Sequence, residues 1–423
     1  MKKKSRLSAF LSLFLLSMLL LTFLSTVPVY ADLSWDIQIV SEDASFFGNG
    51  YCPIKVDSDG NPHIAYSGSP NLGYASWNGS EWDNQKLQTF GFAHDFVLDA
   101  NDTPHITLGS LAYATWNGTQ WDFQTISTDH TVFSSLALDS SGNPHVAYVS
   151  VDKLKYATQN GSNWVTQTVT TANLSGIDYR LSLVLDSNDT PHIMYYSESS
   201  FVDKKGNTIR SINLKLAVLQ NSRWTIEPVL TSLNLVAFGN MVLDSAGHPH
   251  FIVKQYLYPE GSDTRVETIE YVSWDESAWG GSAWNTQTVT SNVSLTHLGL
   301  LALDSEDSPH IIYITWFPQQ LMYARWTGTE WETHHVDEYG LSLSQGFNFV
   351  IDSNGNPHIS YINVPEKNPI VPYHLMYATA TIPDTQPSSQ AFPDSTLLLV
   401  SAAIITSTVI IVVAYVWKKK TKH

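Results

Sequence analysis

The sequence predicts an all-β protein, a closed ring of seven four-stranded sheets, and three observations support this prediction. A turn motif, in which Asp is followed six residues later by the His of a Pro-His pair, occurs seven times. Strand patterns with a period of two, rich in Val, Ile, Thr, Tyr and Trp, surround each copy. The last repeat lacks one strand, and the segment after the N-terminal apolar run supplies it. Copies 40 to 60 residues apart with these turn residues indicate a repeat architecture.

Each repeat contains four short strand-like segments. The first is apolar and ends in the turn Asp ("FVLD"), and the second begins with Pro-His and alternates ("PHVAY"). The third reads like "LAYATW", and the fourth begins at a Trp ("WDFQTI"). Asn-Gly joins the third to the fourth in several repeats and supplies the positive φ angles of a tight hairpin. The fourth turn position, counting Asp as the first, is always Gly or Asp, and both tolerate the left-handed conformation.

The turn motif has a structural interpretation. The Asp accepts hydrogen bonds inside the turn, Pro starts the next strand, and we expect His to tie one turn to its neighbours. A ring of metal ligands is the alternative, but zinc needs three or four ligands at one point and the EF-hand calcium pattern is absent. We therefore expect no metal site. The turn residues are Asp57, Asp99, Asp139, Asp186, Asp244, Asp304 and Asp352, with His63, His105, His145, His192, His250, His310 and His358.

The incomplete last repeat predicts how the ring closes. After Leu375–Ile382 no Trp strand follows, whereas Leu33–Val40 matches the fourth-strand pattern. With Trp35 counted, seven Trp strands balance seven Asp turns. The N-terminal strand then completes the last sheet and leaves no free edge, as in a seven-bladed β-propeller. An open solenoid is the alternative, and it predicts capping units instead of a split repeat.

The N-terminus predicts export. Residues 1–31 have a basic start, a long apolar run and a small-residue site after Ala31, so we expect a cleaved signal peptide. An uncleaved signal anchor is the alternative. The predicted extracellular propeller occupies residues 32–382.

The C-terminus predicts a membrane anchor. Residues 397–417 are 21 residues without a charge, enough to cross a hydrocarbon core of ~30 Å. A Pro/Ser-rich linker at 383–396 precedes them, and the basic tail 418–423 is expected in the cytoplasm. A buried core helix is the alternative. We expect a single-pass type I protein of the cell membrane.

Composition restricts the partners. The net charge of −17 argues against binding a nucleic-acid backbone. Cys52 is the only cysteine, so no intrachain disulfide forms. We expect Cys52 to be a buried apolar residue, with a reactive thiol as the alternative. No pattern in the sequence calls for a cofactor.

The turns "DSxGxPHxxY" and the hairpins "YAxWNGxxW" between Leu33 and Ile382 resemble the BNR/Asp-box sialidase-like repeat proteins. The resemblance implies the propeller architecture. The sialidase box Ser-x-Asp-x-Gly-x-Thr-Trp does not occur here. The Asp turn also lies between the first and second strands, whereas sialidase-like enzymes have it between the third and fourth. No catalytic residue is therefore carried over.

We expect a binding site on the face opposite the short turns. Three long segments, Ser197–Asn213, Val253–Glu267 and Ile362–His374, are expected as loops on that face, where binding residues usually lie. The candidate ligand-binding residues are Lys204, Lys205, Arg210, Tyr256, Tyr258, Asp263, Arg265, Trp316, Phe317, Lys367 and Tyr373.

Three classes of function follow. The favoured hypothesis is a non-catalytic binding or adhesion module for a glycan or protein, and a structural surface protein is the second. A sialidase-type hydrolase is the third, and it needs an arginine cluster with an acid and a nucleophile. The available arginines are Arg180, Arg210, Arg223, Arg265 and Arg325, and we expect Arg223, beside a hairpin turn, on the wrong face. Sequons, which indicate either turn chemistry or glycosylation, occur at Asn78, Asn101, Asn117, Asn160, Asn173, Asn188 and Asn292.

Overall fold

The structure is a computed structural model, and all seven sheets belong to one compact unit, Met1–Thr381. The predicted signal peptide, linker, membrane span and tail lie outside the residues it describes. No helix in the described part of the chain has the length and apolarity to cross a membrane. The described residues are 33–44, 52–68, 71–87, 92–129, 131, 133–171, 174, 181–202, 206, 208–232, 235–257, 266–275, 283–291, 295–315, 318–338, 346–363 and 373–382.

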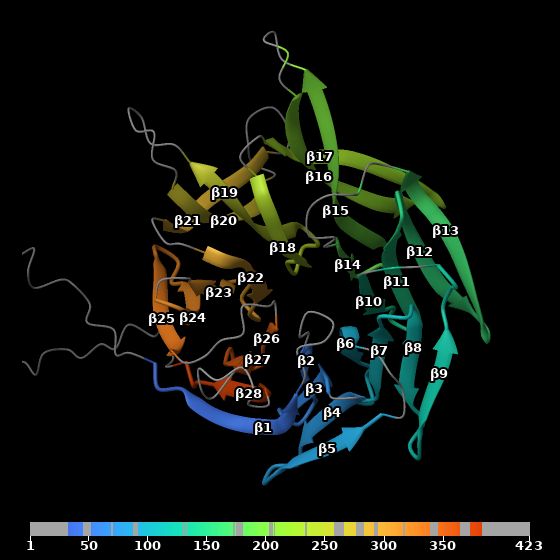
Figure 1. The fold of residues 1–423 in the computed structure, drawn as a ribbon, viewed down its shortest axis with the longest axis vertical. Coiled ribbons are helices and arrows are strands. Elements are labelled where there is room, and N and C mark those ends of the chain that lie inside the picture. Colours follow the sequence, from blue (N-terminus) through green and yellow to red (C-terminus); the bar gives the residue numbers. More distant parts are fainter. Residues whose placement is uncertain are drawn as a thin grey trace, which may run out of the picture. The chain divides into compact units, whose positions relative to one another are not determined.

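These residues form seven antiparallel sheets of four strands, which we call blades 1 to 7 (Figure 1). Blade 1 contains β2 (Ile54–Val56), β3 (Pro62–Ser67), β4 (Leu72–Trp77) and β5 (Trp82–Lys86). Blade 2 contains β6 (Ala93–Leu98), β7 (Pro104–Leu108), β8 (Ala112–Trp116) and β9 (Trp121–Thr125). Blade 3 contains β10 (Ser134–Leu138), β11 (Pro144–Ser150), β12 (Lys153–Asn160) and β13 (Asn163–Thr171). Blade 4 contains β14 (Leu181–Leu185), β15 (Pro191–Val202), β16 (Thr208–Gln220) and β17 (Arg223–Ser232).

The remaining blades follow the same order. Blade 5 contains β18 (Leu235–Leu243), β19 (Pro249–Leu257), β20 (Val266–Asp275) and β21 (Ala283–Ser291). Blade 6 contains β22 (Leu295–Leu303), β23 (Pro309–Thr315), β24 (Gln320–Trp326) and β25 (Trp331–Asp337). Blade 7 contains β26 (Phe347–Ile351), β27 (Pro357–Asn363), β28 (Tyr373–Thr379) and, from the N-terminal end, β1 (Asp36–Ala44).

The predicted ring closure is confirmed. Strand β1 pairs antiparallel with β28, with Asp36 opposite Thr379 and Gln38 opposite Tyr377. The innermost strands contact one another around the ring, and β26 of blade 7 contacts β2 of blade 1. Figure 1 shows the blue β1 beside the red β28. An N-terminal strand thus holds the last blade, and the outer edge of β28 is paired.

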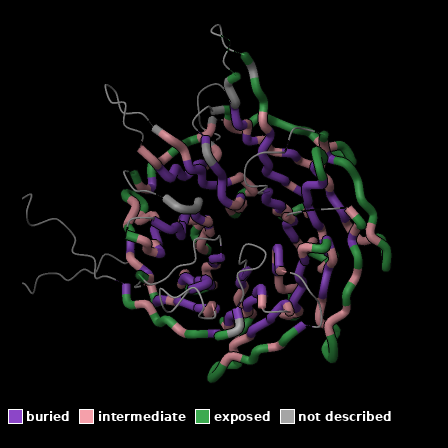
Figure 2. Tube along the Cα trace, viewed as in Figure 1, coloured by how far each residue is buried: buried purple, intermediate pink, exposed green. Residues whose placement is uncertain are grey.

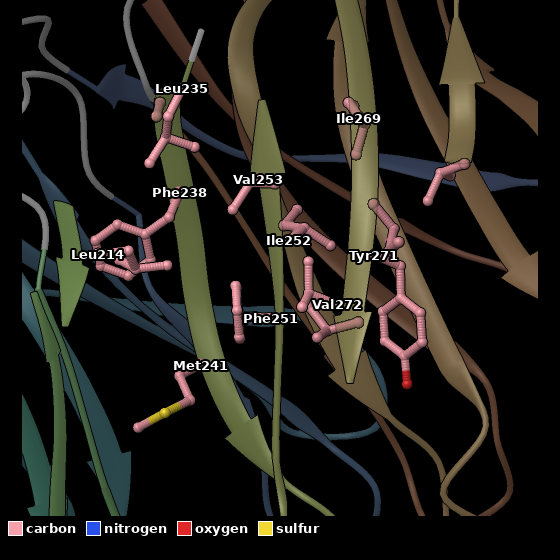
Figure 3. Close-up of a cluster of buried hydrophobic side chains, with 14 of the residues drawn as sticks. Leu214, Leu235, Phe238, Met241, Phe251, Ile252, Val253, Ile269, Tyr271 and Val272 are labelled. Atoms are coloured by element: carbon pink, nitrogen blue, oxygen red, sulfur yellow. The ribbon is translucent and has the colours of Figure 1, made fainter. Parts of the chain in front are cut away.

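The core lies between the sheets. Strand β23 is buried at all seven positions, whereas the outermost strands β5 and β9 have only half-buried and exposed residues, and Figure 2 shows the exposed residues at the periphery. Burial on both faces explains why the second strands read as nearly continuous apolar runs. Figure 3 shows part of one buried cluster, in which Leu214 of blade 4 belongs with Phe238 and Phe251 of blade 5.

The Asp turns connect the first strand of each blade to the second, as predicted. In blade 1, Gly60 N–H donates to the Asp57 carbonyl at 3.1 Å, and Asp57 N–H donates to the Asn61 carbonyl at 2.9 Å. The fourth turn position has a positive φ in every blade, whether it is Gly or Asp. Gly60 has φ 87° and Asp102 has φ 60°. The restriction to Gly and Asp is therefore a backbone requirement.

Of the segments expected as long loops, Ser197–Asn213 is largely strand, and the described residues of Val253–Glu267 are also strand. The second and third strands of blade 4 have 12 and 13 residues and pair as far as Val202 opposite Thr208. In blade 5, β19 and β20 pair as far as Leu257 opposite Val266. In both blades the backbone pairing of the second and third strands continues into the segment expected as a loop. The composition of these segments did not distinguish a longer hairpin from a loop.

Neighbouring blades meet through a repeated aromatic contact. The Trp at or next to the start of the fourth strand of one blade packs edge-on against a Tyr from the third strand of the preceding blade. Trp121 and Tyr74 are a typical pair, with ring centroids 5.2 Å apart and planes at 70°. The others are Trp164–Tyr113, Trp224–Tyr156, Trp331–Tyr271, Trp35–Tyr323 and Trp82–Tyr377. Six of the seven junctions have this contact.

Candidate functional site

The turn histidines lie between the turn Asp and a tyrosine of the same blade. In all seven blades the His Nε2 lies 3.1–3.5 Å from Oδ2 of the turn Asp. In blade 1, the Tyr74 hydroxyl lies 2.5 Å from His63 Nδ1. The same contact joins His105–Tyr113, His145–Tyr156, His250–Tyr271, His310–Tyr323 and His358–Tyr377. The expectation that His bonds to neighbouring turns is wrong, because Asp, His and Tyr all belong to one blade.

The charges of these groups fit a structural role. Burial alone would raise the pKa of Asp57, but hydrogen bonds from Asn61 and His63 outweigh it and lower the pKa. Burial lowers the pKa of His105, and Asp99 offsets this only in part. A neutral imidazole that donates from Nε2 to Asp and accepts the Tyr hydroxyl at Nδ1 satisfies all three groups. Within the described residues no group of three or more His, Cys, Asp or Glu converges as metal ligands would.

A pocket of about 250 Å³ lies in the central channel and is lined by the first strands of all seven blades. Its polar lining residues include Asp95, Ser135, Ser182, Asn240 and Asn348, each four residues before the turn Asp. Phe133, Phe347 and Phe349 also line it. The first strand of each blade ends at the Asp turn. Residues that precede the polar ring in sequence therefore lie toward the face opposite the Asp turns.

The polar ring joins neighbouring blades. Ser135 Oγ donates to Asp95 Oδ2 at 3.1 Å and accepts from the Leu183 N–H at 3.1 Å. Ser182 Oγ accepts from the Met241 N–H at 3.0 Å. Asn240 accepts from the Leu301 N–H at 2.8 Å and donates to the Leu301 carbonyl at 2.7 Å. Asp95, Ser135, Ser182 and Asn240 thus each bond to the next blade and hold the channel lining in place.

The channel also holds ionisable groups. Burial raises the pKa of the Asp95 carboxyl, and the nearby Lys55 charge and the hydrogen bonds from Leu136 and Ser135 offset this only in part. His94 is 4% exposed, and burial lowers its pKa to about 4. Its Nδ1 lies 3.1 Å from Ser134 Oγ, and its ring stacks on Phe133. At neutral pH the His94 imidazole is uncharged.

Most of the predicted ligand-binding residues lie outside the described residues. These are Lys204, Lys205, Tyr258, Asp263, Arg265, Trp316, Phe317 and Lys367. The backbone of Arg210 pairs with Ser200 in blade 4. Tyr256 pairs with Glu267 in blade 5, and Tyr373 pairs with Ala44 in blade 7. These last three residues belong to three different blades.

The described arginines do not form the cluster that a sialidase requires. Arg325 lies in blade 6, where its Nε donates to Glu332 Oε2 at 2.7 Å with both side chains 8% exposed. Arg223 begins the outermost strand of blade 4. Arg180 and Arg265 lie outside the described residues, as does the side chain of Arg210.

Sequence reasoning missed the channel residues. Their signal was a polar residue four positions before the turn Asp, followed by three mainly apolar residues, as in "DFVLD" and "NMVLD". A half-buried strand produces similar isolated polar residues, so the signal becomes specific only when a ring of strands brings these positions together.

Comparisons with known proteins reveal the fold only. No family model and no curated protein matches the chain. The chain is similar to the polysaccharide lyase Uly1, with 8% identity, a TM-score of 0.55 and coverage of 84% of this chain and 100% of that one. It is also similar to a PL25 ulvan lyase bound to GlcA(1-4)Rha3S (12%, 0.52, 83% and 95%). Virginiamycin B lyase from Staphylococcus aureus matches as well (8%, 0.50, 83% and 100%).

The TM-scores show that the chain shares the β-propeller fold with these proteins, and identities this low show nothing beyond the fold. They provide no evidence for the sialidase-like family in particular.

Proposed function

We propose that this protein is a glycan-binding β-propeller and that its site is the central channel. The observation that carries the proposal is the 250 Å³ channel pocket, in which a ring of polar side chains lies beside phenylalanines. Sugars present hydroxyl groups together with apolar C–H faces, and such mixed pockets suit them. Asn240 lines the pocket and has a second amide N–H group besides the one bonded to Leu301, and such a group can donate to a sugar hydroxyl.

The fold neighbours add support from two polysaccharide lyases, one of them bound to a saccharide. Neutral sugars fit best here, because Lys55 and Asp95, two groups of opposite charge, both line the channel and interact with each other. We favour binding without catalysis. Residues 1–31 would direct export, and residues 397–417 would anchor the protein in the membrane. A glycan-binding propeller displayed in this way would act as an adhesion or capture module.

A lyase is the second candidate, and His94 is the observation that favours it. An uncharged imidazole can remove a proton next to a carboxylate, and the Lys55 cation can hold that carboxylate. A pKa of about 4 nevertheless makes His94 a weak base at neutral pH. The chemistry of the channel thus favours binding.

A glycan array with the purified full-length protein tests the main proposal. Val184 lines the channel pocket, and Val184→Phe adds bulk at this wall. We expect Val184→Phe to weaken binding of any glycan that scores by at least about tenfold, which corresponds to ~1.4 kcal/mol. Val165→Ala, at a 51% exposed position on the outer strand β13, is the matched control. Glycan binding that survives Val184→Phe, or no binding to any glycan, contradicts the proposal.

The lyase alternative has its own readout. Incubation with uronate-containing polysaccharides should produce no unsaturated, ultraviolet-absorbing chain ends if the protein only binds. Such ends, produced by the natural chain and lost in His94→Gln, would establish the lyase instead.

A further inference from the structure

The junction between blades 4 and 5 differs from the other six. Strand register places Leu216 where the other blades have the tyrosine, because it lies two residues before Val218, the partner of His192. Tyr74 holds the same position relative to His63 and its partner Ser76. Trp284 of blade 5 therefore has no tyrosine against it, and its indole packs edge-on against Phe251 of its own blade at 5.2 Å.

A pocket of about 420 Å³ lies at this junction. It is lined by Leu216 and His192 from blade 4 and by Trp274 and Trp284 from blade 5, among others. The six tyrosines at the equivalent position are at most 5% exposed, whereas Leu216 is only partly buried. The tyrosine ring of the other junctions is absent here, and the pocket lies beside the residue that replaces it.

His192 keeps the arrangement of the other histidines but lacks its second partner. Its Nε2 lies 3.5 Å from Asp186 Oδ2, as in the other blades. Its Nδ1 is buried and, among the described atoms, has no hydrogen-bond partner. Burial lowers the pKa of His192, so the imidazole is neutral at neutral pH. With the proton on Nε2, facing Asp186, Nδ1 carries a lone pair and acts as an acceptor. An unsatisfied buried acceptor of this kind favours a ligand that brings a hydroxyl group.

The outer strand adds a carboxylate. Three residues after the first Trp of the fourth strand, Gln38, Gln85 and Gln124 accept hydrogen bonds from the Trp indole of the next blade at 3.0–3.4 Å. The equivalent residue in blade 4 is Glu227, which lines the pocket. A carboxylate there disfavours anionic ligands.

We infer that this pocket is a second binding site, separate from the channel, for an uncharged aromatic ring that bears a hydroxyl group. The ring replaces the missing tyrosine side chain: its edge or face packs on Trp284, and its hydroxyl donates to His192 Nδ1. Six copies of the same arrangement within the chain show the geometry that such a ligand completes.

Fluorine NMR of para-fluorophenol with the full-length protein tests the inference. We expect saturable binding of para-fluorophenol, and binding about two- to tenfold weaker for para-fluorotoluene, which lacks the hydroxyl donor. The anion para-fluorobenzoate should not bind. Equal affinity for the phenol and the toluene, or no binding of the phenol, overturns the inference.

Leu216→Tyr places in the pocket the tyrosine that the other six blades have at this position. This variant should not bind para-fluorophenol. Phe251 occupies the position where those blades have Ile or Val, so the double variant Leu216→Tyr/Phe251→Ile restores the common pair if the single variant folds poorly. Val165→Ala is the control and should bind like the natural chain. Phenol binding that persists in the folded Tyr variant places the ligand elsewhere and overturns the inference.

Discussion

Ser58 Oγ donates a hydrogen bond to Asp102 Oδ2 at 2.6 Å, across the junction between blades 1 and 2. The Ser58 N–H donates to Asp102 Oδ1 of the same carboxylate at 3.0 Å. Asp102 is the fourth residue of its turn, and it takes the left-handed conformation that Gly takes in blade 1. The same pair of bonds joins Ser140 to Asp189 and Ser245 to Asp307. Alternate Gly and Asp at this position therefore divide the first six blades into three linked pairs.

Asp102→Asn tests this link. Asn tolerates the left-handed conformation but removes the charge, so we expect a loss of about 0.5–1.5 kcal/mol in the free energy of unfolding. A double-mutant cycle with Ser58→Ala, measured by denaturant unfolding, should give a coupling energy of similar size. Additive effects of the two substitutions would show that the contact contributes no stability.

The buried histidines predict acid sensitivity. A lowered pKa in the folded state means that stability is full above the unfolded value and is lost as the pH falls. For His94, with its pKa lowered from 6.5 to about 4, the loss occurs between these two pH values and amounts to about 3 kcal/mol. We expect the Tm to fall across this window, and less steeply in His94→Gln. The turn aspartates extend the loss below their usual pKa of 3.8.

His374→Gln, in strand β28, controls for the removal of one histidine. Equal slopes of Tm against pH in His94→Gln and the natural chain would refute the assignment to His94.

Tyr113→Phe tests the hydrogen bond within a blade. The substitution leaves the Trp164 contact in place but deprives His105 Nδ1 of its partner, as already occurs at His192. An unsatisfied buried acceptor costs about 1–3 kcal/mol, which thermal or denaturant unfolding detects. Phe123→Tyr, at a 42% exposed site, should change stability by less than about 0.5 kcal/mol. A Tyr113→Phe protein as stable as the natural one would show that the hydroxyl is unimportant.

Cys52 reports on the closure of the ring. It is 1% exposed and packs with Val40 of β1 and Tyr377 of blade 7, and burial raises its pKa to about 12. We expect a maleimide to label it only when the junction opens, so native labelling should be slow and should accelerate in Val40→Ala. Rapid labelling of the native protein would mean that this junction is open in solution.

The sequence was sufficient to predict the Asp turns, the number of strands and the closure of the ring by β1, because each of these predictions rests on short sequence patterns. The restriction to Gly or Asp at Gly60 and Asp102 follows from backbone conformation alone. The contacts of Asp102 with Ser58 and of Asp95 with Ser135 join residues 44 and 40 positions apart, and nothing local indicates them. The absence of a tyrosine at Leu216 was visible in the sequence, but its consequence required the neighbouring blade.

The pairing of Asp36 with Thr379 also constrains how the protein is made. About 340 residues separate the two strands, so at 5–20 residues per second a ribosome needs roughly 20–70 s to deliver the partner of β1. During that time six blades can fold, but the backbone groups of β1 have no partner strand. A chain that stops before its final blade therefore leaves β1 without its partner strand, and unpaired strand edges of this kind favour aggregation.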